Sequence, residues 1–286
     1  MALRTQISER QRRFGAELRR LREGAGLAVK DAGALVGMGG PQLSHIEAGR
    51  TGLDPDRLTV LLGAYGHMDE TYAAALQQMG LSNGKGWWSP FKGFVMSSAL
   101  DLAESESSAA ALSSYETLLI PGLLQVSGYS ETILSGDQKK VEFRRGRQQA
   151  ISGDGAVPLH AVIHEAALRT QFGGPEVMRE QLDYLVEVSE LPHVTIQILP
   201  FRCTEYVSTD TPFMLVHGPH SELDTALMEH PGGSTFHGDP DSLTAFRSKF
   251  ERLKSLALPE LDATRSLRAR TEHDSLGLIQ HVRYTL

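Results

Sequence analysis

The sequence contains one cysteine, Cys203, among 286 residues. A single thiol excludes an internal disulfide and a cage of several thiolates around a metal, and it is typical of a reducing compartment. The sequence also lacks an apolar run of about 18 residues, the length that a membrane-spanning helix needs. Its first residues, MALRTQISERQRR, are charged and lack the apolar centre of a signal peptide. We therefore expect a cytoplasmic protein with no membrane contact.

Motifs of nucleotide sites and catalytic sites are also missing. There is no P-loop and no GxGxxG, and Cys203 has neither a helix start nor a paired histidine near it in sequence to lower its pKa. Four histidines lie within 21 residues, at His217, His220, His230 and His237, but HGPH and EHPGG lack the helical spacing of a zincin. A metal site at these histidines stays open as an alternative. We expect no cofactor and no enzymatic activity.

The net charge of −7 is unevenly distributed along the chain. Residues 1–22 contain seven arginines and two glutamates, a balance of +5, whereas residues 87–286 contain 17 basic and 26 acidic residues, a balance of −9. A basic front on an acidic body is expected if only the front contacts a polyanion such as DNA. A solvated, arginine-rich helix is the alternative that composition leaves open.

The first 80 residues are predicted to form an all-helical domain with helices at residues 8–23, 30–36, 40–48, 55–66 and 69–80. Ser8 can cap the first helix, and Pro41 suits the first position of the third, where a missing N–H costs nothing. In the second helix, Ala32, Leu35 and Val36 are expected to face inward. The turn-rich stretch LSNGKGWWSP, residues 81–90, is interpreted as a linker.

Residues 91–286 change character and predict an α+β domain. Helical patterns cover residues 95–106, 125–135, 173–190 and 241–258, and a helical tail is expected to start near Pro259. Alternating or continuous apolar runs, typical of strands, fall within residues 157–168, 194–201, 211–218 and 224–230. Strands interspersed with helices indicate a mixed domain, which we expect to regulate or to bind a partner.

The segment GGPQLSHIEAGR, residues 39–50, follows a short helix and a glycine-containing turn, the arrangement of a helix-turn-helix. From residue 27 to residue 50 the spacing resembles the XRE family of phage-repressor-like headpieces. Gly33 stands where that family usually has alanine. The resemblance implies an all-α, five-helix helix-turn-helix headpiece. The matching residues are Leu27, Gly37, Leu43, Ser44, Ile46, Glu47, Gly49 and Arg50.

This resemblance implies that the start of the third helix reads DNA bases. Gly40 and Pro41 have no side-chain donors. We therefore expect base reading from Gln42, Ser44 and His45, from the backbone at residues 39–40 (Gly39 and Gly40), or from DNA shape. Phosphate contacts are expected from a larger basic set, whose neutralising effect is sensitive to salt. This set comprises Arg10, Arg12, Arg13, Arg19, Lys30 and Arg50.

The resemblance also implies a structural brace between the first and third helices. In the XRE family the residue at Glu47 pairs with an arginine late in the first helix, which is Arg22 in this sequence. Removing one partner of a partly buried ion pair costs several kcal/mol. We therefore expect this pair to hold the headpiece together and to perform no chemistry.

The second part has a resemblance of its own, over roughly residues 88–280. Its segments SSYETLLIPGLLQVSGYSETIL, VIHEAALRTQFGGPEVMREQLDYLVE, VTIQILPF and TALMEH are similar to a domain of unknown function that commonly follows an XRE headpiece in actinobacteria. The resemblance implies a regulator, often encoded beside a small partner protein. Histidine and glycine are more frequent between residues 217 and 238 than that family's pattern predicts.

Together these features predict a two-domain transcription regulator. Residues 1–80 would bind a palindromic double-stranded operator as half of a homodimer, and residues 91–286 would dimerise and sense a partner protein or a small molecule. The alternative is an antitoxin-like protein whose main role is to hold a small partner protein, with DNA binding secondary.

Overall fold

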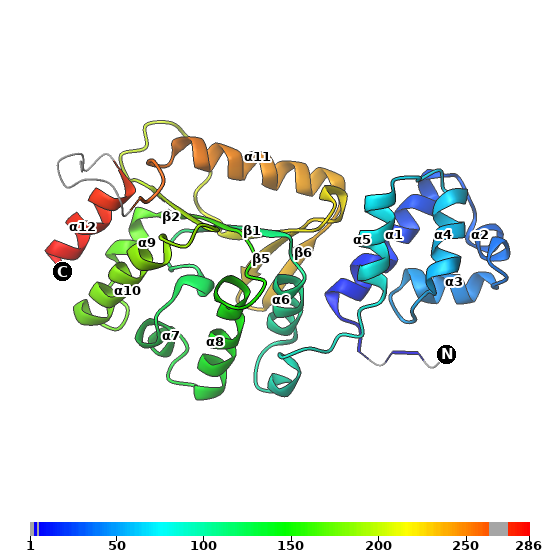
Figure 1. Ribbon diagram of the computed structural model, residues 1–286, viewed down its shortest axis with the longest axis horizontal. Helices are drawn as coiled ribbons and strands as arrows, with labels where there is room; N and C mark the ends of the chain where they lie inside the picture. Colours follow the sequence, from blue (N-terminus) through cyan, green and yellow to red (C-terminus); the bar gives the residue numbers. More distant parts are fainter. Residues whose placement is uncertain (1–2, 5, 263–273) are drawn as a thin grey trace. The chain divides into compact units, whose positions relative to one another are not determined.

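The structure is a computed structural model that describes residues 3–4, 6–262 and 274–286. The chain divides into two compact units (Figure 1). The first contains Met1–Ser89 together with Gly218–Asp224, and the second contains Pro90–His217 and Thr225–Leu286. Residues 218–224 therefore belong to the first unit although more than 120 residues separate them from it in sequence.

Five helices form the body of the first unit, which confirms the predicted helical headpiece. Asp54 and Asp69 cap the last two helices by accepting hydrogen bonds from the backbone N–H groups of Arg57 and Tyr72. At the start of the first helix, the Gln11 side chain accepts from the Ser8 N–H. The helices are α1 (Glu9–Gly24), α2 (Val29–Leu35), α3 (Gly40–Glu47), α4 (Pro55–Ala64) and α5 (Glu70–Gly80).

The predicted inward position of Leu35 is wrong, because its side chain is 51% exposed. Ala32 and Gly33 of α2 are buried together with Val36, which directly follows the helix, and residue 35 lies off this buried side. The helix is oriented so that Gly33 faces the following turn, where an added Cβ would lie 2.8 Å from the Met38 carbonyl oxygen. This close approach explains why glycine stands where the XRE pattern has alanine.

The second unit is built on a six-stranded mixed sheet with the order β3-β2-β1-β4-β5-β6. Strands β1, β2 and β3 are parallel to one another, and β4, β5 and β6 continue the sheet in antiparallel pairs. The predicted α+β class is confirmed. The strands are β1 (Ala111–Glu116), β2 (Leu159–His164), β3 (Val194–Leu199), β4 (Phe213–His217), β5 (Thr225–His230) and β6 (Gly233–His237).

Helices cover both faces of this sheet (Figure 1). Helix α11 (Pro240–Leu256) packs on one face through Leu243, Phe250 and Leu253, against Val162 and Leu215. A larger apolar core lies on the other face, where alternate strand residues point. Its helices are α6 (Ser97–Ser107), α7 (Ser127–Ile133), α8 (Gln138–Ser152), α9 (Glu165–Arg169), α10 (Pro175–Val188) and α12 (Ser275–Thr285).

The helical tail expected from Pro259 is wrong for residues 259–262, which are not helical. Part of that expectation falls at residues 263–273, outside the described residues, and α12 starts at Ser275. Instead, the Leu261 N–H donates to the Ile196 carbonyl at 2.8 Å, so this stretch follows the edge strand β3. The Ser275 hydroxyl donates to the Pro259 carbonyl and accepts from the Ile198 N–H. Among the described residues, no helix is long and apolar enough to cross a membrane.

Candidate nucleic-acid interface

A tight turn joins α2 to α3. Gly37 adopts a positive φ of 65°, which favours glycine, and the Met38 N–H donates back to the Gly33 carbonyl at 2.9 Å. Gly39 then precedes the first turn of α3, and Pro41 lies within that turn. The turn thus sets two short helices at a fixed angle, as a helix-turn-helix requires.

Helix α3 has a buried face and an open face. Leu43 and Ile46 are buried in the headpiece core, whereas Gln42 and Ser44 are exposed and His45 is half-buried. The polar side chains that sequence reasoning singled out therefore lie on the open side of the helix. Their donors and acceptors are of the kinds that pair with base edges.

Gly40 differs from the other residues selected for base reading because it is buried. A Cβ at this position would lie 3.4 Å from Cα of Lys30, at the start of α2. Gly40 therefore allows the start of α3 to pack against the start of α2. The side chains proposed to read bases belong to neighbouring residues.

The Arg22–Glu47 contact fixes α3 to α1. Arg22 Nε donates to Glu47 Oε1 at 2.6 Å and Nη2 donates to Oε2 at 3.0 Å, while Nη1 donates to the Leu27 carbonyl at 2.8 Å. The side chains of Arg22 and Glu47 are only 9% and 7% exposed. The hydrogen bonds with Glu47 raise the pKa of the Arg22 guanidinium above its usual value, against the effect of burial.

The crossing of α1 and α3 depends on a glycine. A Cβ added at Gly15 would lie 2.4 Å from the Glu47 carbonyl oxygen and 2.7 Å from that of Ile46. Only a residue without a Cβ allows the α3 backbone this close to α1. Gly15 and Arg22 are seven residues apart, two helical turns, so the close approach and the ion pair lie on one face of α1.

A contact that sequence reasoning missed holds the end of α3. The Arg4 Nη1 atom donates to the Gly49 carbonyl at 2.9 Å, and the Arg4 N–H donates to the Arg50 carbonyl at the same distance. Residue 4 precedes the first predicted helix and belongs to no periodic pattern. Its role therefore becomes visible only in the structure, where it lies beside Gly49.

The predicted phosphate residues occupy different environments. Arg12 and Arg19 are exposed and pair with Glu9 at 2.8 Å and with Glu23 at 2.7 Å. Exposed pairs of this kind contribute little to stability and exchange partners readily. Among the other members of the set, Lys30 and Arg50 are exposed and Arg10 is half-buried.

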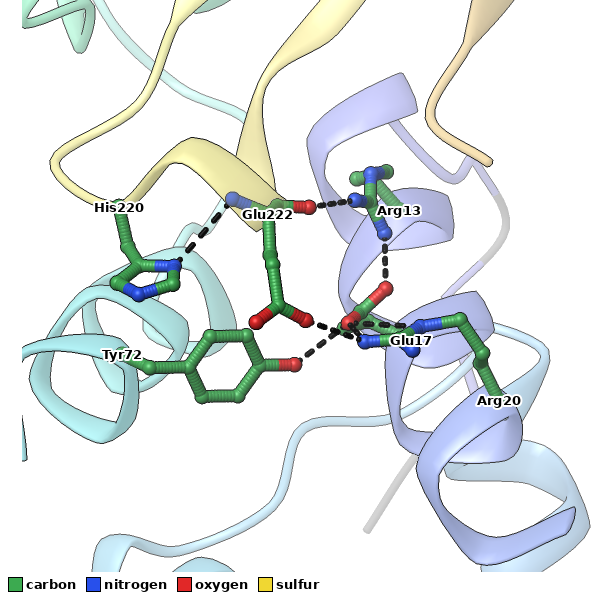
Figure 2. A network of polar contacts seen from close by, with 6 residues as sticks. All are labelled: Arg13, Glu17, Arg20, Tyr72, His220 and Glu222. Carbon is green, nitrogen blue, oxygen red and sulfur yellow. Dashed lines mark hydrogen bonds and ion pairs between the residues drawn. The ribbon is translucent and has the colours of Figure 1, made fainter. Parts of the chain in front are cut away.

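Arg13 is a correction to the phosphate set. Its side chain is 8% exposed, and it donates to Glu17 Oε2 at 2.5 Å and to the main-chain oxygen of Glu222 at 2.7 Å (Figure 2). A guanidinium enclosed in this way is not presented to a phosphate. Sequence alone could not separate Arg13 from Arg12, because its acceptor lies 209 residues away.

The four histidines considered for a metal site have separate surroundings. His217 Nε2 lies 2.9 Å from the Ser113 hydroxyl, and His220 contacts the Tyr72 ring edge-on. His230 Nδ1 accepts from the Gly232 N–H, and the His237 ring packs against Phe246. Within the part of the chain that the structure describes, no group of three or more histidine, cysteine, aspartate or glutamate residues is arranged to hold a metal ion.

Comparison with protein families gives two matches. A family model described as a helix-turn-helix domain matches residues 13–75, and one described as a domain of unknown function (DUF5753) matches residues 99–269. These matches confirm a helix-turn-helix domain followed by a domain of unknown function, as the two resemblances implied. A search of curated proteins and a search of solved structures each found no match.

Proposed function

This chain belongs to the family defined by the domain of unknown function DUF5753, and because a helix-turn-helix domain precedes that domain, we propose that it is a homodimeric, sequence-specific transcription regulator. In this proposal α3 enters the major groove of double-stranded DNA. The second unit dimerises and receives a partner protein or a small ligand. That ligand would change DNA binding only as far as it distinguishes two states of the protein.

The open face of α3 carries the proposal. Gln42, Ser44 and His45 are presented outward by a helix whose other face is fixed by Gly15, Leu43 and the Arg22–Glu47 pair. A reading helix must be held rigidly, because base discrimination of about 1–3 kcal/mol per good contact depends on exact hydrogen-bond geometry. Residues with no side-chain donor open the helix, so the proposed base contacts are few and DNA shape supplies the rest.

Non-specific affinity comes from the exposed basic residues. On α1, Arg12 and Arg19 are seven residues apart and share one side of the helix, while Lys30 and Arg50 flank α3 in sequence. Phosphate contacts would replace the exposed pairs with Glu9 and Glu23. Arg13 is left out of this proposed set because it is buried.

Selection of genomic DNA fragments by the purified full-length protein tests the proposal. We expect an enriched palindromic motif whose half-sites lie about one helical turn, roughly 34 Å, apart, because two α3 helices related by a twofold axis would read it. Light scattering of the same sample should give the mass of a dimer.

Enrichment no better than for random fragments would contradict sequence-specific regulation. If a small protein then co-purified with the chain, the antitoxin-like alternative would replace it. A monomer that nevertheless selects a single half-site would contradict the homodimer alone.

A further inference from the structure

The seven residues Gly218–Asp224 connect β4 to β5, yet they are part of the first unit. Leu223 is 3% exposed and belongs to the same hydrophobic core as Phe14, Leu18, Tyr72 and Leu76 of the headpiece. A leucine from a strand connection thus completes a core that is otherwise built from the first 80 residues. No pattern in the sequence predicts this contribution.

Polar contacts of the neighbouring Glu222 accompany the leucine (Figure 2). The main-chain oxygen of Glu222 accepts from Arg13 Nη2 at 2.7 Å, and its carboxylate accepts from Arg20 Nη2 at 3.0 Å. Both arginines also donate to Glu17, which is 1% exposed. The segment therefore shares its donors with a buried carboxylate of α1.

Glu17 connects α1 to α5 at the same place. The Tyr72 hydroxyl donates to Glu17 Oε1 at 2.6 Å, and the Tyr72 ring meets His220 edge-on at 5.3 Å between ring centroids. The Tyr72 ring also packs against the His67 ring, with 3.9 Å between ring centroids. Residues 218–224 thus contact the two helices α1 and α5 through a buried leucine, an ion pair and an aromatic contact.

The segment is attached to the side of α1 that faces away from α3. Residues 13, 17 and 20 follow the i, i+4, i+7 spacing of one helical face, whereas Gly15 and Arg22, which contact α3, lie about half a turn round the helix. The segment consequently leaves the open face of α3 uncovered. It can act on α3 only through the placement of α1 and α5.

The segment has a defined shape of its own. The Gly218 N–H donates to Asp224 Oδ1 at 2.9 Å, and the Glu222 N–H donates to His220 Nδ1 at 3.3 Å. No linker residues separate it from the strands, since β4 ends at His217 and β5 begins at Thr225. The chain therefore runs from the segment into both strands without an intervening residue.

We propose that Gly218–Asp224 is a positioning element of the DNA-binding unit. Leu223 and Glu222 hold α1 and α5 in the arrangement that sets α3, and strands β4 and β5 pass changes in the second unit to the headpiece through them. This inference rests on the proposed function, because it names the route by which the second unit regulates DNA binding.

Hydrogen–deuterium exchange of the full-length protein, without DNA, is the first test. Leu223→Ala should speed exchange in residues 9–24 and 70–80 about tenfold or more, since it empties part of the headpiece core. Leu182→Ala is the matched control: this leucine is also buried, but it lies on α10 in the core of the second unit and not on β4 or β5. It should leave exchange in those two helices unchanged.

DNA affinity is the second readout. It is measured under conditions in which tryptophan fluorescence shows that every variant is fully folded. We expect Leu223→Ala to weaken binding about fivefold or more, within the range of coupling between sites, and Leu223→Met to restore it. Unchanged exchange in both helices would show that the segment does not hold α1 and α5 in place, and this result would overturn the proposal. Faster exchange together with wild-type DNA affinity would mean that the segment only stabilises the headpiece. This result would overturn its role as a positioning element.

The two proposals fail in different ways. If the wild-type protein bound no DNA, the proposed function would fail. The exchange comparison of Leu223→Ala with Leu182→Ala would still decide whether the segment holds α1 and α5 in place.

Discussion

At the scale of single residues, the headpiece relies on charged groups that are buried in pairs. Arg22 and Glu47 are each less than 10% exposed and joined by two hydrogen bonds, and Glu17 is enclosed by Arg13, Arg20 and Tyr72. Removing one member of such a pair leaves a buried charge without compensation, which costs far more than the intact pair contributes. These residues therefore set the sensitivity of the headpiece to substitution.

Glu47→Ala should destabilise the first unit by about 3 kcal/mol, because Arg22 stays buried without its carboxylate. Both tryptophans of the chain, Trp87 and Trp88, lie in the first unit, so denaturant unfolding followed by their fluorescence reports this unit within the full-length protein. Glu23→Ala is the control, since Glu23 also contacts Arg22 but is 52% exposed, and it should cost less than about 1 kcal/mol. Equal effects of the two substitutions would contradict the brace.

Glu17 should make the headpiece sensitive to acid. Burial raises the pKa of Glu17, but the hydrogen bond from Arg20, the charge of Arg13 and the hydrogen bond from Tyr72 outweigh it, so the pKa lies below the usual value. A carboxyl with a lowered pKa in the folded state stabilises the fold above its unfolded pKa, about 4.3, and this contribution is lost as the pH falls through the folded pKa.

Glu17→Gln tests this account of acid sensitivity. The free energy of unfolding of the wild-type first unit should fall more steeply below about pH 4.3 than that of the variant. The variant should also be less stable at pH 7, where it lacks the charge that Arg13 and Arg20 face. Parallel pH curves for the two proteins, followed by tryptophan fluorescence, would show that Glu17 does not titrate as argued.

The residues of the candidate site differ in how far sequence could predict them. The Arg22–Glu47 contact was predicted from the resemblance to a headpiece family, whose pattern places both residues within one small domain. The burial of Arg13 was not, because it depends on Glu222, a residue of another segment. A local pattern places a side chain on a helix face but does not show which distant segment covers that face.

At the scale of helices and strands, close packing of backbones sets the position of α3. Gly15→Ala should destabilise the first unit by about 1–3 kcal/mol, since the new Cβ would overlap the Glu47 carbonyl. Gly24→Ala is a matched control on the same helix, where an added Cβ meets nothing within 4 Å. It should be neutral or slightly stabilising, because alanine favours the helix. Equal losses for both variants, measured by tryptophan fluorescence, would contradict the close crossing.

Several elements of the second unit were not predicted: residues 165–168, expected within a strand, belong to helix α9, and no strand was expected at β6. Strand β1 and helix α8 show two physical reasons. Strand β1 has serines at its centre, Ser113 and Ser114, which are buried despite their polarity; Ser113 pairs with His217. Helix α8 is highly polar, and one of its few buried residues is Arg147, which pairs with Glu106 at 2.7 and 2.9 Å. Hydrophobic periodicity misses elements whose buried residues are polar and satisfied by distant partners.

At the scale of the whole molecule, the uneven charge leads us to expect polyanion binding at the basic front of the chain and not at its acidic second part. Arg12→Ala with Arg19→Ala should lower the slope of log affinity against log salt concentration by roughly 1.8, if each arginine neutralises one phosphate. Titration of random duplex DNA at several salt concentrations measures this slope. Replacing Lys139 and Lys140, which pair with Glu142 and Asp137 in the acidic second part, is the control and should leave the slope unchanged.

The most direct test of DNA reading by α3 compares the affinity for the selected motif with that for random duplex DNA. Wild type and the Gln42→Ala/His45→Ala double variant are measured at one salt concentration. The account predicts that the double variant loses about tenfold or more in affinity for the motif and little for random DNA, because each base contact contributes about 1–3 kcal/mol of discrimination. Equal losses on both DNAs, or no loss on either, would contradict sequence reading by α3.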